Sequence, residues 1–180
     1  MMYNLQPLPL KGAFVLMLPY SLDERGEFVK TFHVHTLQDS GIEFQLKESF
    51  YSISNKNVIR GMHFQMPPYQ LSKFVFCPVG EIQDVIVDLR AASPTYGQHF
   101  AIRLSAENHL ALFIPEGFAH GFKALSDTAI TYYLVSEVYH RQHDTGIHIN
   151  SIGYDWEVDH PNISQRDAGF VALKDFKSPF

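Results

Sequence analysis

The stretch ESFYSISNKNVIRGMHFQMPP, residues 48–68, carries the pattern that decides the fold. Residues 48–54 contain aromatic and β-branched side chains that are typical of a strand, and Asn55-Lys56-Asn57 is typical of a turn. Residues 58–65 then form a second extended segment, which ends before Pro67-Pro68. The pattern predicts two neighbouring strands, with His63 on the second one between Arg60 and Gln65.

The rest of the chain repeats this alternation of short extended segments and turns. A turn at residues 23–26 precedes an alternating segment at 28–32, and further turns lie at 79–80, 93–94, 115–117 and 126–127. More strands are predicted at residues 12–18, 73–78, 81–88, 99–104, 110–114 and 129–139, and short helical segments at 35–39 and 164–174. This spacing predicts a mainly β sandwich or barrel with a few short helices, in one domain of residues 1–180.

Composition narrows the class of protein. The chain is 46% apolar, which favours a packed core, and its net charge of −5 argues against binding to nucleic acid. No apolar run reaches the length of a membrane span, and the N-terminus lacks a signal-peptide pattern. The single cysteine, Cys77, excludes an internal disulfide and is interpreted as a buried, inert thiol. We therefore expect a cytoplasmic protein.

Two segments resemble the cupin barrels: the strand around His63 and the run Pro115-Glu116-Gly117-Phe118-Ala119-His120. Metal-binding cupins take two histidines and a glutamate from the first segment and one histidine from the second. Here the second histidine position holds Gln65, and the glutamate position falls on Tyr69 or Gln70. Because a transition metal needs about three protein ligands, we predict a cupin-like jelly-roll barrel without a metal.

The motifs together resemble one family more closely, that of dTDP-4-dehydrorhamnose 3,5-epimerase. The resemblance runs in order through segments 23–26, 60–65, 80–90, 93–97, 104–108, 114–122 and 163–167. It implies an enzyme that inverts C3 and C5 of a nucleotide-linked 4-keto-6-deoxyhexose without a cofactor, in the synthesis of deoxysugars for surface polysaccharides. The C4 ketone makes the hydrogens on C3 and C5 acidic. Inversion at either carbon therefore needs a base on one face, an acid on the opposite face and a stabilised enolate between the two proton transfers.

The resemblance assigns four catalytic positions. His63 would be the base, Asp167 the carboxylate that orients it, Tyr133 the acid on the opposite face, and Lys73 the cation near the enolate. Adjacent strand residues point to opposite faces, so only one of Tyr132 and Tyr133 can enter the cavity, with Tyr132 left for core packing. Without the resemblance, Asp167 reads as a helix cap and Lys73 as a solvated lysine.

The resemblance also implies a set of binding residues. Arg25, Arg60 and Arg166 would contact the nucleotide or its diphosphate, although each alone reads as an ordinary surface arginine. Tyr139 would stack on the pyrimidine base. It points to the same face as Tyr133 if the strand stays regular, because the two positions differ by an even number of residues. The other positions assigned to substrate or nucleotide are Glu48, Gln65, His120 and Asp144.

The chain departs from the family pattern at the nucleotide-binding end. Lys30 stands where the family has Glu, Glu48 and Phe50 replace a Gln and an Asn, and Asp144 replaces a Glu. The run Trp-Asn-Asp that normally follows is missing. The nucleotide and the inverted carbon therefore stay open, with CDP-linked sugars and inversion at C3 or C5 alone as alternatives.

Two other functions stay open as well: a sugar 3,4-ketoisomerase and a non-catalytic sugar-binding cupin. The resemblance further implies a homodimer that exchanges N-terminal strands. In it, residues 1–50 or so would contribute to the dimer, and residues from about 153 to 180 would pack on the barrel.

Overall fold

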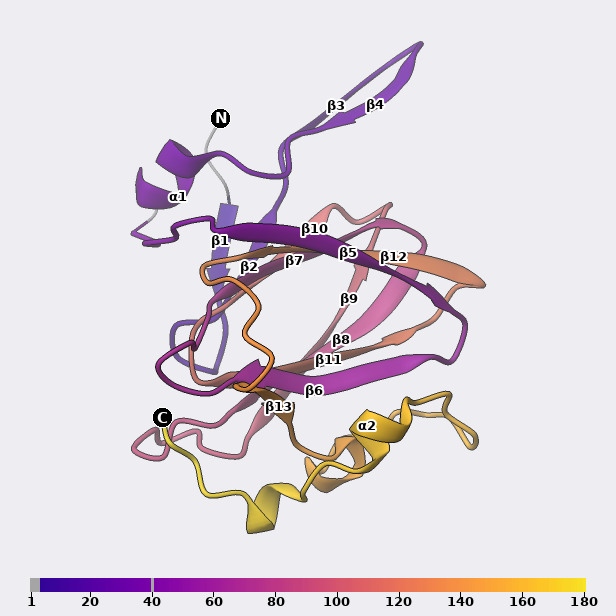
Figure 1. The fold of residues 1–180 in the computed structure, drawn as a ribbon. Coiled ribbons are helices and arrows are strands. Elements are labelled where there is room, and N and C mark those ends of the chain that lie inside the picture. The colour runs from indigo at the N-terminus through magenta and orange to yellow at the C-terminus, as the bar shows by residue number, and fades with distance from the viewer. Residues whose placement is uncertain (1–3, 40) are drawn as a thin grey trace.

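Two antiparallel sheets face each other and enclose a shared core in the computed structural model, which describes residues 4–39 and 41–180 (Figure 1). The six-stranded sheet has the order β1 (Asn4–Pro7), β2 (Phe14–Met17), β10 (Leu110–Ile114), β7 (Lys73–Val79), β12 (Thr128–Val135), β5 (Glu48–Asn55). The five-stranded sheet has the order β13 (Asp144–Gly146), β6 (Ile59–Gln65), β11 (Phe118–Ala124), β8 (Glu81–Asp88), β9 (His99–Ser105). The predicted mainly β class is confirmed.

Helical structure is short and lies outside the sheets, as expected. It comprises α1 (Val34–Asp39), α2 (Gln165–Ala168) and the 3₁₀ turns η1 (Ile149–Ser151) and η2 (Leu173–Asp175). The strands β3 (Tyr20–Asp23) and β4 (Gly26–Val29) form a separate hairpin that projects away from the barrel (Figure 1). No helix in the described part of the chain has the length and apolar character needed to cross a membrane.

Alternating side chains divide the apolar residues among three clusters. Val75 of β7 and Ile86 of β8 belong to the cluster between the sheets. On the outer face of the six-stranded sheet, Phe74 and Phe76 pack with residues of the α1 region such as Leu37. On the outer face of the five-stranded sheet a third cluster forms, against which C-terminal residues pack. Packing on the outer faces thus covers most of β7 and β8, and the inner faces are left to build a cavity.

The structure differs from the predicted strands at several places, and two of the differences bear on the cavity. Residues 118–124 form β11, which the sequence did not reveal because all seven residues are buried and show no alternation. The predicted strand 129–139 is wrong at its end, because β12 stops at Val135. Val135 pairs with Glu48 and Lys73, the first residues of β5 and β7, so no strand remains for residues 136–139 to pair with. Tyr139 therefore reaches the cavity from a loop.

Strands β6 and β11 approach closely where two glycines meet. A Cβ on Gly61 would lie 2.5 Å from Gly121 Cα, and one on Gly121 would lie 2.6 Å from Met62 Sδ. Gly61 also has a φ of 142°, a conformation that side chains disfavour. The pairing shifts register between His120 and Phe122, and His120 lies opposite His63. The glycines thus bring the two histidine-bearing strands together.

Candidate active site

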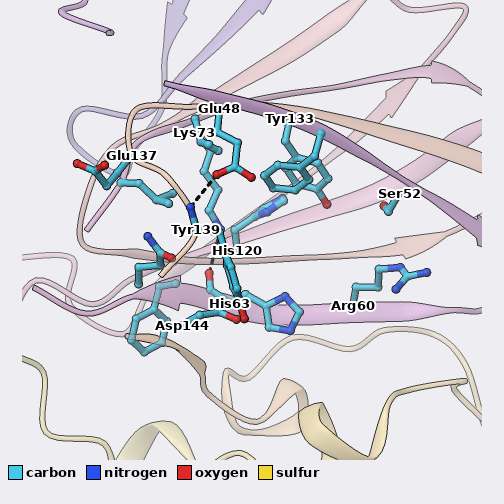
Figure 2. A pocket seen from close by; sticks show the side chains of 15 residues that line it. Glu48, Ser52, Arg60, His63, Lys73, His120, Tyr133, Glu137, Tyr139 and Asp144 are labelled. Carbon is cyan, nitrogen blue, oxygen red and sulfur yellow. Dashed lines mark hydrogen bonds between the residues drawn. The ribbon is translucent and has the colours of Figure 1, made fainter. Parts of the chain in front are cut away.

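A cavity of about 250 Å³ lies between the two sheets, and most of the predicted site residues line it (Figure 2). The six-stranded sheet and the loop after β12 contribute Glu48, Lys73, Tyr133 and Tyr139, and the five-stranded sheet contributes Arg60, His63, Gln65, His120 and Asp144. Asp167 and Arg166 lie beside the cavity on α2, whereas Arg25 lies on the projecting hairpin. The barrel therefore gathers residues that are far apart in the sequence.

His63 and Asp167 form a hydrogen-bonded pair. His63 Nε2 lies 2.9 Å from Asp167 Oδ1, and the Gly61 amide donates to Asp167 Oδ2 at 3.3 Å. Burial acts against ionisation of Asp167, but these hydrogen bonds outweigh it and hold the pKa below its ordinary value. With Nε2 donating to this carboxylate, the His63 Nδ1 atom carries the lone pair and can accept a proton.

Asp167 owes its position to a capped helix. Ser164 is the N-cap of α2, and its hydroxyl accepts a hydrogen bond from the Asp167 amide at 3.0 Å. The ring of Phe170, just after this helix, meets the His63 ring edge-on at a centroid distance of 5.8 Å. A segment a hundred residues away in sequence therefore holds the imidazole from two sides. Asp167 lies in the first turn of a helix, as the alternative reading expected, and it also contacts His63.

Tyr133 enters the cavity from the sheet opposite His63. It packs in the cluster between the sheets and stacks on Phe50 at 4.7 Å. Burial, aided by the negative charge of Asp84, raises the pKa of Tyr133 above its ordinary value, so the phenol stays protonated at neutral pH. Tyr132 faces the other way and stacks on Tyr51 and Phe76. The predicted orientation of the two tyrosines is confirmed.

A second histidine–carboxylate pair joins His120, which lines the cavity, to Asp84, which is buried behind it. His120 Nε2 is 2.8 Å from Asp84 Oδ2, and both side chains are buried. Burial lowers the pKa of His120 even though Asp84 opposes that effect, so its imidazole is neutral around pH 7 and donates to the carboxylate. Asp84 is not among the site residues predicted from the sequence. Its signal was an acidic residue at an inward-facing position of the apolar strand β8.

Lys73 brings a cation to the cavity wall between these pairs. Its Nζ atom donates to the His63 carbonyl oxygen at 3.1 Å. Burial lowers the pKa of Lys73 to about 8, with the carboxylates of Asp144 and Asp84 opposing the shift. Lys73 is therefore largely protonated at pH 7, and it loses its proton within an accessible pH range.

Two arginines flank the site on the side of α2. Arg60 donates to Ser54 Oγ at 3.0 Å, and Arg166 pairs with Asp144 at 2.7 Å. A more open pocket of about 460 Å³ is lined by both arginines and shares His63 with the main cavity. Guanidinium groups beside a cavity are suited to bind phosphate oxygens.

Arg25 stands apart from these residues. It pairs with Asp23 at the tip of the β3–β4 hairpin, with its side chain 85% exposed. Within one chain, the hairpin does not bring this guanidinium to the cavity. Phe50, by contrast, lines the cavity although the sequence analysis noted it only as a departure from the family pattern.

The remaining acidic and thiol groups have clear structural surroundings. Glu137 lines the mouth and pairs with Lys47, and Glu48 accepts a hydrogen bond from the Tyr139 amide at 2.7 Å (Figure 2).

Cys77 is buried, and burial raises its pKa to about 11, as an inert thiol requires. In residues 4–39 and 41–180, no three His, Cys, Asp or Glu side chains are grouped so that they could hold a metal ion.

Comparison with known proteins decides which family builds this site. Residues 7–175 match the sequence model of dTDP-4-dehydrorhamnose 3,5-epimerase. The chain belongs to this family. A dTDP-4-dehydrorhamnose 3,5-epimerase of Methanothermobacter thermautotrophicus is 43% identical in an alignment of 171 residues, and the alignment covers 92% of this chain and 92% of that one. The family consists of sugar epimerases of the isomerase class. The family predicted from the sequence motifs is therefore confirmed.

Two further relatives bear on the fold and on the reaction. The crystal structure of a dTDP-6-deoxy-D-glucose-3,5-epimerase from Legionella pneumophila, in complex with dTDP-4-keto-L-rhamnose, has a TM-score of 0.93 and 32% identity. The match covers 97% of this chain and 95% of that one, so the cupin-like barrel is confirmed. A Streptomyces niveus relative, 36% identical over 94% of this chain and 84% of its own, is named a dTDP-4-dehydrorhamnose 3-epimerase. Relatives that are similarly identical to this chain thus carry names that specify different inverted carbons, C3 alone or C3 and C5.

Proposed function

We propose that this chain inverts C3, C5 or both in a dTDP-linked 4-keto-6-deoxyhexose, by proton transfer alone. The observation that carries the proposal is the placement of His63 and Tyr133, which line one cavity from opposite sheets. A base on one face of the sugar and an acid on the other is what inversion at a carbon next to a ketone requires.

The reaction then divides into two proton transfers. His63 Nδ1 takes the proton from the carbon next to the C4 ketone, and Asp167 stabilises the imidazolium that forms. The electron pair moves to the ketone oxygen as an enolate, which protonated Lys73 stabilises. The Tyr133 hydroxyl gives its proton to the opposite face of the carbon, and the ketone is restored. His63 and Tyr133 then return to their starting states by exchange with solvent, so no electron acceptor takes part.

Binding would use the residues around the mouth. We assign the diphosphate contact to Arg60 and Arg166, which line the adjoining pocket, and stacking on the nucleotide base to Tyr139, which is exposed. Such a nucleotide sugar is an intermediate that other enzymes of deoxysugar synthesis must supply and consume.

Deuterium incorporation tests the function directly. The protein is incubated with dTDP-4-keto-6-deoxyglucose in deuterated water, and the sugar is analysed by mass spectrometry and NMR. Two deuterons at C3 and C5 indicate a 3,5-epimerase, one deuteron a single-centre epimerase, and a shifted carbonyl a ketoisomerase. The same assay with CDP-, UDP- and GDP-linked sugars identifies the nucleotide. Binding without exchange for every sugar would refute catalysis and indicate a sugar-binding protein.

We also propose a homodimer, supported by the apolar surface of the projecting hairpin and of edge strand β5. Leu22 and Phe28 on the hairpin are 70% and 65% exposed, and Tyr51 and Ile53 on β5 are 59% and 56% exposed. Apolar surface of this extent typically marks a protein interface. Light scattering after size-exclusion chromatography measures the mass, and a monomer at micromolar concentration would contradict the proposal.

A further inference from the structure

The side-chain amide of Gln65 connects the two loops that border the mouth of the cavity. Its Nε2 atom donates to the carbonyl oxygens of Tyr69, at 2.8 Å, and Val138, at 3.2 Å. Its Oε1 atom accepts from the His140 amide at 2.6 Å. Gln65 is 4% exposed, so these bonds are shielded from water. Both of its donor hydrogens are used within the protein, and none is left for a ligand.

These bonds hold the backbone on both sides of Tyr139. Val138 and His140 are its neighbours in sequence, and the Tyr139 amide itself donates to Glu48. The segment between β12 and β13 belongs to no strand, so it lacks the backbone hydrogen bonds that pair strands in a sheet. The side-chain hydrogen bonds of Gln65 and Glu48 hold this segment instead. The Tyr69 ring adds a further link, because it stacks on the His140 ring at 3.8 Å.

The ring of Tyr139 is less constrained than its backbone. It is 58% exposed and lines the cavity beside His63 (Figure 2). An exposed ring adopts a defined position only if the backbone that carries it is fixed. Gln65 lies two residues after His63 on β6, so one strand carries both the base and the group that fixes this loop.

We propose that Gln65 is a positioning residue, which acts on ligand binding by fixing the Tyr139 loop and does not itself contact the ligand. The identity of the ligand, a nucleotide that stacks on Tyr139, rests on the proposed function. Loss of Gln65 should therefore weaken nucleotide binding and leave the proton-transfer groups in place.

Two variants of Gln65 test this role. Gln65→Leu removes all three bonds, whereas Gln65→Glu keeps the size and the acceptor but brings a carboxylate against two carbonyl oxygens. Calorimetry with dTDP and steady-state kinetics are measured for each. We expect the dissociation constant of dTDP and the KM of the sugar substrate each to rise about tenfold or more. The value of kcat should change by less than about threefold. An unchanged dissociation constant in both variants would overturn the proposal.

A double variant separates positioning from direct contact. If Gln65 acts through Tyr139, then Gln65→Leu should have little further effect on binding in a Tyr139→Ala background. Additive losses would show instead that Gln65 contacts the ligand. Gln142→Leu is the matched control, because Gln142 is an exposed glutamine in the same loop, and it should bind dTDP as the unaltered protein does.

Amide hydrogen exchange tests the loop without any ligand. In Gln65→Leu, which removes the acceptor of the His140 amide, that amide should exchange faster than in the unaltered protein, while amides of β12 should not change. Unchanged exchange at His140 would overturn the proposal. If the unaltered protein neither binds dTDP nor turns over a sugar, the proposed function fails, and the exchange experiment still decides whether Gln65 fixes the loop.

Discussion

At the scale of single residues, the proposed mechanism pairs His63 as the base with the phenol of Tyr133, which burial keeps protonated. Tyr133→Phe removes only the hydroxyl and keeps the ring stacked on Phe50. We expect the yield of inverted sugar to fall about 100-fold or more, while deuterium still enters with the original configuration through His63. NMR of the sugar after incubation in deuterated water measures both. Tyr132→Phe, on the outer face of the sheet, should behave as the unaltered protein; inversion at an undiminished rate in Tyr133→Phe would exclude this tyrosine as the acid.

In the proposed mechanism, the pKa of Lys73 sets an upper pH limit on the reaction. Because burial lowers it to about 8, the cation that stabilises the enolate is present below that pH and lost above it. The value of kcat/KM should therefore fall as the pH rises through 8. Lys73→Arg, whose guanidinium stays charged, should move this decline to higher pH. A profile that stays flat to pH 10 in the unaltered protein would contradict the role of Lys73.

At the scale of elements, the close approach of β6 and β11 depends on glycine. Gly121→Ala would place a Cβ 2.6 Å from Met62 Sδ and 2.8 Å from the Arg60 carbonyl oxygen, so the two strands must separate. We expect the free energy of unfolding to fall by about 1–3 kcal/mol, measured by urea denaturation. Gly169→Ala is the control, because its Cβ would meet nothing closer than 3.4 Å. Equal stability of the two variants would show that the strands adjust without cost.

At the scale of the whole molecule, the exposed position of Arg25 on the hairpin offers a test of the proposed dimer. If Arg25 acts in the site of the partner subunit, then dimers that combine Arg25→Ala with His63→Ala chains contain one intact site. Random pairing of equal amounts should restore about a quarter of the unaltered activity, although each variant alone is impaired. Co-expression with two affinity tags, followed by the deuterium assay, measures this recovery. If Arg25 acts within its own chain, mixing restores nothing.

The sequence by itself determined the class of fold and the family, and it predicted most of the polar residues that line the cavity. Strand spacing and turn residues are local properties, so β5, β8 and β10 could be predicted within a residue or two. The resemblance to the family selected Tyr133 as the acid, and the alternation of side chains along a strand then excluded Tyr132 from the cavity. Cys77 could be read as a buried thiol from its apolar neighbours.

Only the tertiary structure decided which of these residues meet. Asp167 contacts His63 because a capped helix turn folds back under β6, and no local pattern encodes a contact across a hundred residues. Asp84 shows its role only once β8 lies beside β11, and Gln65 only once two loops converge on its amide. The end of β12 is likewise set by where its neighbouring strands begin. Contacts of this kind depend on how the sheets are stacked, which the order of residues along one strand does not specify.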